Sequence, residues 1–239
     1  MSPDSRQLDA ARRLWNLDGE PRFIRRVANF VYESSSGGRP LILRLTEPAH
    51  RSVKQLESEL DWLNFLAERG LRVSAPVRSG NGALVEELDG EKRLFAGVFE
   101  KAPGGFLTDA KQLEPASVRE WGRYLGRMNK LTLDYRPAPS IEPRPEWDQE
   151  EMLACALRAA EPGDALPYRR LNELLEWLRL LPRTPDGYGL VHADLHTGNF
   201  FVDERGMTAF DFDDSCRHWH GYDLATPLYQ LLWTEGAEA

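Results

Sequence analysis

Three polar residues in the C-terminal half of the chain have types and a spacing that suit phosphoryl transfer. Asp194 and Asn199 stand five residues apart in the segment HADLHTGN, and Asp211 follows in the segment FDFDD. Phosphoryl transfer requires little covalent chemistry from a protein, so catalysis depends mainly on positioning the reactants and neutralising their charge. A carboxylate can orient an attacking hydroxyl, and carboxylate and amide oxygens are ligands that Mg²⁺ prefers. Asp194 would then face the acceptor, with Asn199 and Asp211 as ligands of Mg²⁺.

The residues around this set are expected to form three short strands. Apolar runs alternate there with turn residues, which is typical of strands joined by tight connections. The expected strands cover residues 187–192, 199–202 and 207–210, with a polar turn that ends in glycine at 203–206. Because a four-residue connection of this kind predicts a hairpin, the loop with Asp194 would lie between strands and Asp211 would follow the third strand.

The segment HADLHTGNFFVDERGMTAFDFDD resembles the catalytic segment of the aminoglycoside phosphotransferase/choline kinase family, whose fold is similar to that of the eukaryotic protein kinases. The resemblance implies Asp194 as the catalytic aspartate and Asn199 and Asp211 as the Mg²⁺ ligands, with ATP as the phosphoryl donor. Asp213 and Asp214 fall where family members often carry further acids, and the roles of both stay open. Asp223 resembles a family aspartate that supports the catalytic loop.

A transition-metal site is an alternative interpretation of the same region. His192, Asp194 and His196 alternate and would share one face of a strand. Further candidate ligands for such a cluster are Asp211, Asp213, His218 and His220. Such a cluster would favour metal-assisted hydrolysis. This interpretation leaves Asn199 and the N-terminal half of the chain unexplained.

The N-terminal half offers a cation and a carboxylate for the phosphates of a nucleotide. A kinase places a cation over the α- and β-phosphates and orients it with a helix carboxylate. Arg44 is the single charge in the apolar run LILRL, and Glu59 opens the helical segment ELDWLNFL. The family has lysine at the strand position, and arginine is larger and forked, so the exchange is not neutral. An edge-strand arginine in a surface ion pair is the alternative.

A second departure from the family lies in residues 25–32, where the family places a hairpin that covers the phosphates. Asn29 and Tyr32 match the family pattern, but the usual glycines are missing. Backbone amides would therefore approach the phosphates less closely. Arg25 or Arg26 can compensate with a side-chain cation, or both can simply be solvated.

The segment LFAGVFEKAPG, residues 94–104, resembles the hinge between two lobes. Adenine recognition at such a hinge uses backbone groups, and we expect those of Glu100 and Ala102 to bind the base. The chain should then divide into a nucleotide-binding lobe over residues 1–102 and a catalytic and acceptor-binding lobe over residues 103–239. The predicted fold class is α+β: a two-lobed protein-kinase-like fold with a small β-rich N-terminal lobe and a mainly helical C-terminal lobe.

Apolar periodicity predicts the remaining elements of both lobes. Strands are expected at residues 30–32, 40–46, 83–88 and 93–100, and helices at 9–15, 52–69, 114–131, 147–159 and 168–180. Residues 136–145 are rich in proline and should form an extended loop. The chain ends at Ala239, where family members usually continue with more helices, so a shortened C-terminus is part of this prediction.

The composition is that of a globular protein in a reducing compartment. Hydrophobic residues make up 41% of the 239 and charged residues 28%, and neither Cys155 nor Cys216 belongs to a paired metal motif. No apolar run approaches the roughly 18 residues that span a bilayer, and the first residues lack the apolar core of a signal peptide. The formal net charge of −8 disfavours nucleic acid as a partner. We therefore expect a cytoplasmic protein that binds neither membrane nor nucleic acid.

The predicted reaction is transfer of the γ-phosphoryl group of MgATP to a hydroxyl group of a small molecule. Aminoglycoside-like antibiotics, amino alcohols, homoserine and sugars are the acceptor classes considered. A protein serine or threonine is the alternative acceptor, because some bacterial relatives resemble stress-response protein kinases. The missing glycines, Arg44 and the shortened C-terminus would instead suit a truncated pseudokinase or a nucleotide-binding module.

Overall fold

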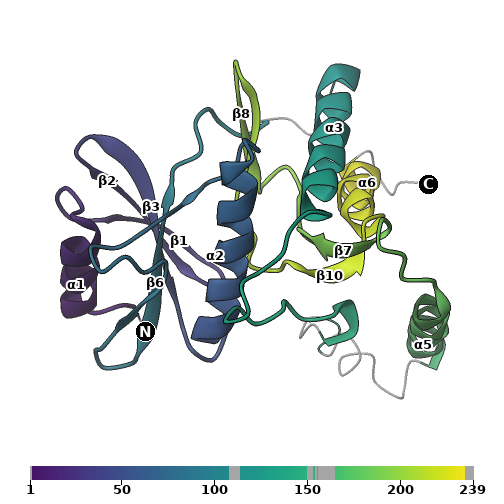
Figure 1. The fold of residues 1–239 in the computed structure, drawn as a ribbon, viewed down its shortest axis with the longest axis horizontal. Helices are drawn as coiled ribbons and strands as arrows, with labels where there is room; N and C mark the ends of the chain where they lie inside the picture. The colour runs from purple at the N-terminus through teal and green to yellow at the C-terminus, as the bar shows by residue number, and fades with distance from the viewer. Residues whose placement is uncertain (1, 108–113, 150–152, 154, 156–164, 235–239) are drawn as a thin grey trace.

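The computed structural model describes residues 2–107, 114–149, 153, 155 and 165–234 and has two lobes side by side (Figure 1). The N-terminal lobe is built on a β-sheet, and the C-terminal lobe is mainly helical. This is the two-lobed α+β arrangement that the sequence predicts. Within the described residues, none of the helices combines the length and apolarity that crossing a membrane requires.

The N-terminal lobe contains one antiparallel sheet and two helices. Its elements, in chain order, are α1 (Ser5–Trp15), β1 (Arg22–Arg26), β2 (Phe30–Ser36), β3 (Arg39–Thr46), α2 (Val53–Glu68), β4 (Pro76–Val77), β5 (Glu86–Leu88) and β6 (Leu94–Glu100). The strand order is β1-β2-β3-β6-β4, with β5 also paired to β6. Apolar alternation does not predict β1, because all five of its residues are exposed; only the family resemblance places a hairpin here, over residues 25–32.

The alternation of side chains along β3 separates the two faces of the sheet. Leu41, Leu43 and Leu45 are fully buried in a cluster with residues of α1. Ile42 packs instead against the cluster that α2 shares with the C-terminal lobe, and Figure 1 shows α1 and α2 on opposite sides of the sheet. Arg44, two residues from Ile42, therefore lies on the face that α2 covers.

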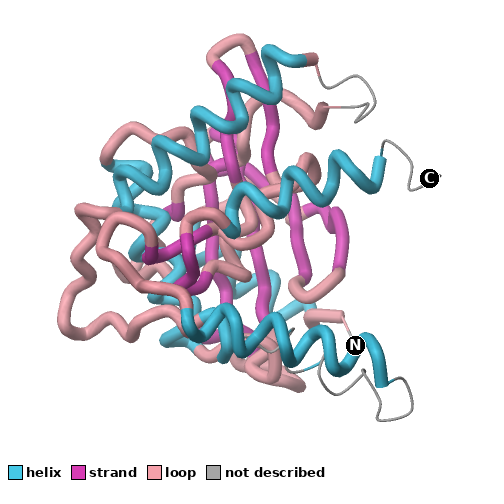
Figure 2. The backbone as a smooth tube through the Cα atoms, turned by 90° about the vertical axis from the view of Figure 1, so that its right-hand side faces the viewer, coloured by secondary structure: helices cyan, strands magenta, loops and turns pink. Residues whose placement is uncertain are grey.

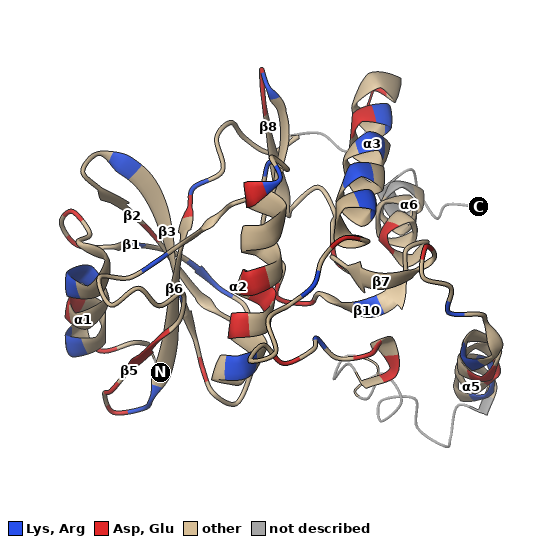
Figure 3. Ribbon diagram, in the orientation of Figure 1, with Lys and Arg blue, Asp and Glu red and all other residues tan. Residues whose placement is uncertain are grey.

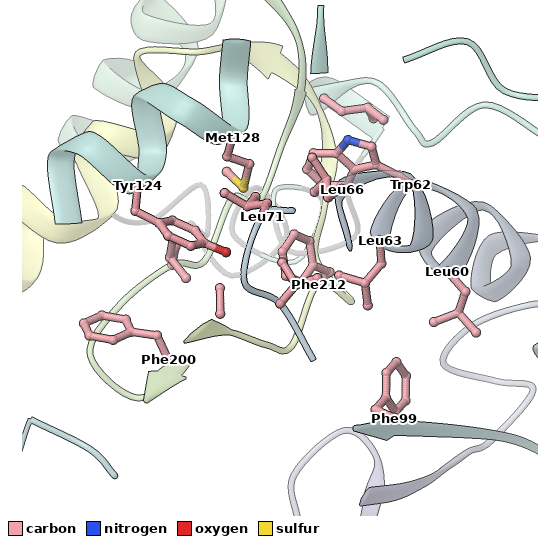
Figure 4. Packing of buried hydrophobic residues seen from close by; sticks show 14 of the residues in the cluster. Leu60, Trp62, Leu63, Leu66, Leu71, Phe99, Tyr124, Met128, Phe200 and Phe212 are labelled. Atoms are coloured by element: carbon pink, nitrogen blue, oxygen red, sulfur yellow. The ribbon is translucent and has the colours of Figure 1, made fainter. Parts of the chain in front are cut away.

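Helix α2 connects the sheet to the C-terminal lobe. Ser52 caps its first turn, and its side chain accepts a hydrogen bond from the backbone N–H of Gln55. The ring of Trp62 meets that of Phe212 edge-on at 5.4 Å, and its Nε1 donates to Thr132 Oγ1 at 3.2 Å. Figure 4 shows this cluster, with side chains of α2 on one side and those of the C-terminal lobe on the other. The shared core holds α2 in a fixed position beside the segment that carries Asp194 and Asp211.

The C-terminal lobe combines helices with short strands. Its elements are α3 (Pro115–Thr132), the 3₁₀ turn η2 (Trp147–Gln149), α5 (Ala165–Leu180), β7 (Tyr188–Val191), β8 (Phe200–Asp203), β9 (Gly206–Ala209), β10 (Cys216–Trp219) and α6 (Tyr222–Thr234). The predicted hairpin is present as β8 and β9, paired antiparallel. β7 pairs with β10, a strand for which the sequence shows no local signal. The predicted helix at 147–159 begins at η2 and otherwise lies largely outside the described residues.

Helices α1, α3 and α5 carry their charges toward water. Figure 2 shows α3, α6 and α5 one below another on the side of the molecule away from the sheet. Acidic and basic positions are interspersed along α1, α3 and α5 (Figure 3), and pairs such as Arg12–Asp9 and Arg179–Glu176 lie one turn apart. Such exposed pairs add little stability, so the buried faces of these helices hold them in place.

Candidate active site

The loop between β7 and β8 holds Asp194 and Asn199 against each other. Asn199 Nδ2 donates hydrogen bonds to the Asp194 carbonyl at 2.8 Å and to Asp194 Oδ2 at 2.9 Å. Asn199 is buried, while the Asp194 side chain is 42% exposed. Asp194 and Asn199, five residues apart in the sequence, are thus the two ends of a loop that their hydrogen bonds close. It leaves the Asp194 carboxylate fixed in direction and open to solvent.

His192 is fully buried, and its side chain packs beneath the exposed face of this loop and supports it. Its Nε2 lies 3.2 Å from the Phe210 carbonyl, and the Asp194 backbone N–H donates to Nδ1 at 3.3 Å. These contacts assign the ring proton to Nε2, and burial lowers the pKa of His192, so the ring is neutral. The side chain connects the loop to the end of β9 and is not available as a metal ligand.

Asp223, in the first turn of α6, holds the start of the same loop. Its two carboxylate oxygens accept hydrogen bonds from the backbone N–H groups of His192 at 3.2 Å and Ala193 at 2.9 Å. Ala193 has a φ of +70°, a conformation that a non-glycine residue adopts only where its surroundings enforce it. Burial raises the pKa of Asp223 to about 7. These hydrogen bonds agree with the family resemblance, which implies that Asp223 supports the loop.

Asp194 is ionised at neutral pH. Partial burial opposes its ionisation, but hydrogen bonding and charge attraction from His196, with a further hydrogen bond from Asn199, hold the pKa of Asp194 below its usual range. His196 Nε2 lies 3.5 Å from Asp194 Oδ2, and the carboxylate raises the pKa of His196 in turn. An ionised carboxylate at this position can accept a hydrogen bond from a hydroxyl group.

Asp211 follows β9 and completes the predicted set. Its φ of +67° bends the chain directly after the strand. Arg25, in β1, places its Nη2 3.0 Å from Asp211 Oδ2. The hairpin of β1 and β2 therefore reaches across the cleft between the lobes and touches the segment that carries Asp211.

Arg44 and Glu59 form a buried pair between β3 and α2. The guanidinium donates two hydrogen bonds to the carboxylate, at 2.8 and 2.6 Å, and lies 4.8 Å from the centre of the Phe99 ring. Arg44 is 7% exposed and Glu59 is not exposed at all. β3 is an interior strand of the sheet. The alternative of an edge-strand arginine in a surface ion pair is therefore wrong.

A cavity of about 310 Å³ separates the two lobes. Apolar side chains from both lobes line most of it, namely Ile24, Val31, Ile42, Leu63, Phe99, Phe106, Phe201 and Phe210. Arg25, Arg44 and Asp211 form a charged part of its wall, and Gly198, next to Asn199, lines it too. At the hinge, the Glu100 N–H donates to the Ala75 carbonyl at 2.8 Å. The cavity thus joins an apolar section to a charged one beside the catalytic segment.

Asp213 does not line the cavity between the lobes. It is buried and contacts Asn29 Nδ2 at 3.1 Å, His50 Nε2 at 2.6 Å and Arg51 Nε at 3.3 Å. Although burial opposes ionisation, His50, Arg44 and Arg51 hold the pKa of Asp213 well below its usual range. The acid therefore fastens the loop ahead of α2 and the β1–β2 hairpin to the catalytic segment.

Three basic residues in this network were not identified from the sequence. His50, Arg51 and Arg144 lie in loops, where no periodicity marks a side chain as buried. Arg144 donates to the carbonyls of Ser215 at 2.7 Å and Asp213 at 2.6 Å. The one available signal was the charge of these residues, which is shared by many exposed arginines.

The donor set fits a hard divalent cation and not the transition-metal cluster. Among the described residues, no group of three or more His, Cys, Asp or Glu is arranged to hold a metal ion. His218, part of that alternative, stacks on Tyr222 with 4.1 Å between ring centroids. The Asn199 amide nitrogen is committed to Asp194, so the oxygen of the same amide is the atom that can face a cation. An amide oxygen and a carboxylate suit Mg²⁺ or Ca²⁺.

Comparison with known proteins identifies relatives of this chain. The model of the phosphotransferase enzyme family matches residues 21–239. Amicoumacin kinase of Bacillus subtilis (strain 168) is 40% identical over 228 residues, which are 94% of this chain and 67% of the relative. Homoserine kinase of Sinorhizobium medicae (strain WSM419) is 30% identical over 208 residues, which are 84% of this chain and 59% of the relative. The chain thus spans about three fifths to two thirds of the length of these curated relatives.

Solved structures share the fold. An amicoumacin kinase in complex with AMP-PNP, Ca²⁺ and Ami is 35% identical with a TM-score of 0.87, and the match covers 95% of this chain and 68% of that one. A microcompartment-associated aminopropanol kinase, 24% identical with a TM-score of 0.73 over 95% of this chain and 77% of that one, shows the fold alone. The family match, the 40% identity and the shared kinase-like architecture agree, so the chain belongs to the phosphotransferase enzyme family.

Proposed function

We propose that this chain transfers the γ-phosphoryl group of ATP to a hydroxyl group of a small molecule. The observation that carries the proposal is the closed Asp194–Asn199 loop beside a cavity whose wall includes Arg44 and Asp211. Phosphoryl transfer uses three kinds of group that this site contains. They are a partly exposed, ionised carboxylate, two oxygen ligands for a metal ion, and a buried arginine on a strand.

The nucleotide is proposed to lie in the cavity between the lobes. The apolar section accepts the adenine ring between Ile42 of the N-terminal lobe and Phe210 of the C-terminal lobe. Glu100 and Lys101 already donate their backbone N–H groups to the carbonyls of Ala75 and Pro40. The Glu100 carbonyl and the Ala102 N–H are therefore the groups proposed to bind the adenine edge. The division into lobes at residues 102 and 103 belongs to the same proposal.

The metal proposed for this site is Mg²⁺. The Asn199 amide oxygen and the Asp211 carboxylate would hold it. A bound divalent cation neutralises charge on the phosphate oxygens. The relative solved with AMP-PNP and Ca²⁺ supports the use of a nucleotide with a divalent cation.

Asp194 is proposed to orient the acceptor hydroxyl. Its carboxylate accepts the hydroxyl hydrogen bond and takes the proton late, as the bond from the acceptor oxygen to the γ-phosphorus forms and the bond to the ADP oxygen breaks. The fixed direction of this carboxylate, held by Asn199, supports the assignment. The Arg44–Glu59 pair secures the phosphate end of the nucleotide.

The acceptor is proposed to be a small hydroxylated molecule. The names of the relatives, amicoumacin kinase at 40% and homoserine kinase at 30% identity, support this class. No observation in the described residues favours a protein serine or threonine. The retained geometry of Asp194, Asn199 and Asp211 argues against a pseudokinase. The cytoplasmic location stays a prediction.

Two experiments test the proposal. Isothermal titration of the chain with AMP-PNP, with and without Mg²⁺, should give binding that Mg²⁺ strengthens. An assay of ADP release with ATP and a panel of amicoumacin, homoserine, 1-amino-2-propanol and aminoglycosides should then identify an acceptor, with Asp194→Asn as the inactive control. A chain that binds no nucleotide under either condition would exclude the proposed function.

A further inference from the structure

The β1–β2 hairpin contains an irregularity at Ile24. Phe23 pairs with Tyr32 and Arg25 with Val31, so Ile24 is an extra residue in β1 with no partner of its own in β2. A bulge of this kind bends a strand and redirects the side chains that follow it. Ile24 and Arg25, consecutive residues that regular alternation would send to opposite faces, both line the cavity between the lobes.

The neighbouring arginine has different partners. Arg26 lies with its guanidinium carbon 4.4 Å from the centre of the Phe30 ring, and its Nη2 is 2.8 Å from Glu47 Oε2. It does not line the cavity. The chain thus offers two adjacent arginines of similar exposure, of which Arg25 faces the cavity and Arg26 does not.

The other cations in the wall of the cavity are paired with carboxylates of the N-terminal lobe and have fewer free donors. Arg44 uses both terminal nitrogens on Glu59. Lys101 forms an ion pair with Glu33. Arg25 has a side chain that is 47% exposed and one terminal nitrogen on Asp211, so most of its N–H donors can still meet a ligand.

The tip of the hairpin is fastened to the same segment that carries Asp211. Asn29 Nδ2 donates to Asp213 Oδ2 at 3.1 Å, and Asp213 is in turn held by His50 and Arg51. With Arg25 on Asp211 and Asn29 on Asp213, the hairpin makes two contacts with one short segment. The position of Arg25 over the charged part of the cavity is therefore fixed by the fold.

We propose that Arg25 binds the phosphate groups of the nucleotide, in place of the backbone amides that a glycine-rich hairpin supplies. The inference rests on the proposed function. A cation held by Asp211 also contacts phosphate oxygens, so those oxygens come close to the Asp211 carboxylate. A guanidinium 3.0 Å from that carboxylate is within reach of them, and its planar set of donors suits phosphate.

The test compares Arg25→Ala with the matched control Arg26→Ala. Titration calorimetry with AMP-PNP and Mg²⁺, and separately with adenosine, measures each affinity in the wild-type chain and both variants. Arg25→Ala should weaken AMP-PNP binding by about 10- to 100-fold, the effect of losing charged hydrogen bonds. Adenosine affinity should be unchanged, and Arg26→Ala should bind both ligands within about twofold of the wild type. Arg25→Lys should recover part of the loss.

The possible results separate this inference from the proposed function. Unchanged AMP-PNP affinity in Arg25→Ala would overturn the inference and leave the proposed function intact. An equal loss for adenosine and AMP-PNP would also overturn it, because Arg25 would then act only by holding the hairpin. A wild-type chain that binds neither ligand would exclude both. Unfolding curves of the variants show whether each is folded at the titration temperature.

Discussion

The guanidinium of Arg44 and the carboxylate of Glu59 form two hydrogen bonds across the space between β3 and α2, and the two side chains are 8% and 0% exposed. Both charged groups are buried, so each depends on the other to compensate for the hydration that it loses on folding. The pair also fixes the distance between the sheet and α2. An arginine at this position is therefore a structural part of the lobe, in addition to the phosphate-binding role that is proposed for it.

Removing one member of this pair should destabilise the protein strongly. Arg44→Ala leaves the Glu59 carboxylate buried without its partner, and the free energy of unfolding should fall by about 3–5 kcal/mol. Arg44→Lys keeps the charge but cannot form the forked pair, so it should lose about 1–2 kcal/mol. Urea denaturation of the three proteins measures both changes. If Arg44→Ala were as stable as the wild type, the pair would not hold α2 to the sheet.

Asp194→Asn should abolish turnover while leaving the nucleotide site intact. The amide keeps the shape of the side chain and an oxygen that can accept from Asn199, but it cannot take the hydroxyl proton. We expect kcat to fall by about 10²- to 10⁴-fold, with the affinity for AMP-PNP and Mg²⁺ unchanged. Steady-state kinetics and calorimetry provide the two readouts. Comparable kcat values for the wild type and the variant would remove Asp194 from its proposed role.

Asp211→Asn should uncouple nucleotide binding from the divalent cation. Loss of the carboxylate removes one of the two proposed metal ligands, so adding Mg²⁺ should strengthen AMP-PNP binding less than in the wild type. Asp214→Asn is the matched control, because Asp214 lies three residues away, has a 40% exposed side chain and pairs with Arg51. Calorimetric titrations with and without Mg²⁺ measure the effect. The same dependence on Mg²⁺ in Asp211→Asn and the wild type would contradict the metal assignment.

Gly104 connects the lobes at a point where only glycine fits. Its φ is +90°, and a Cβ atom there would lie 2.1 Å from the Val202 carbonyl oxygen. Gly104→Ala should therefore lower the free energy of unfolding by about 1–3 kcal/mol. At Gly105 a Cβ atom would meet no atom within 4 Å, so Gly105→Ala should change stability by less than about 1 kcal/mol. Thermal and urea unfolding of both variants measure the difference, and equal effects would refute the proposed close contact.

Local patterns in the sequence account for much of this site. The spacing of Asp194 and Asn199 belongs to one loop, and the hairpin of β8 and β9 depends on the short turn between Asp203 and Gly206, so both are encoded over short distances. Local patterns likewise predict the strand that carries Arg44 and the helix that carries Glu59, and the kinase pattern predicts that the two side chains pair. The family resemblance adds the position of Asp223.

Contacts between distant segments could not be predicted in this way. Pairing of β7 with β10 depends on how the chain returns after Asp211, and no local pattern specifies it. The burial of Asp213 by Asn29, His50 and Arg51 joins residues more than 160 positions apart. The direction of Arg25 depends on an unpaired residue in β1, which becomes evident only when the register with β2 is known.

Protonation of His218 should destabilise the fold below neutral pH. The ring is 8% exposed, stacks on Tyr222 and meets Trp147 and Trp219 edge-on, and burial lowers its pKa to about 4. In the unfolded chain the pKa returns to about 6.5. Between these two values the unfolded state binds more protons, so stability falls as the pH is lowered, by up to about 1.4 kcal/mol per pH unit.

His218→Phe tests this dependence because it keeps an aromatic ring in the stack and removes the titrating group. The difference in unfolding free energy between the wild type and the variant should be constant above about pH 7 and should shift against the wild type from about pH 6.5 to about pH 4. Urea denaturation at several pH values in this range measures it. A difference that stays constant down to pH 4.5 would mean that His218 is protonated equally easily in the folded and unfolded chain, which its burial among three aromatic rings argues against.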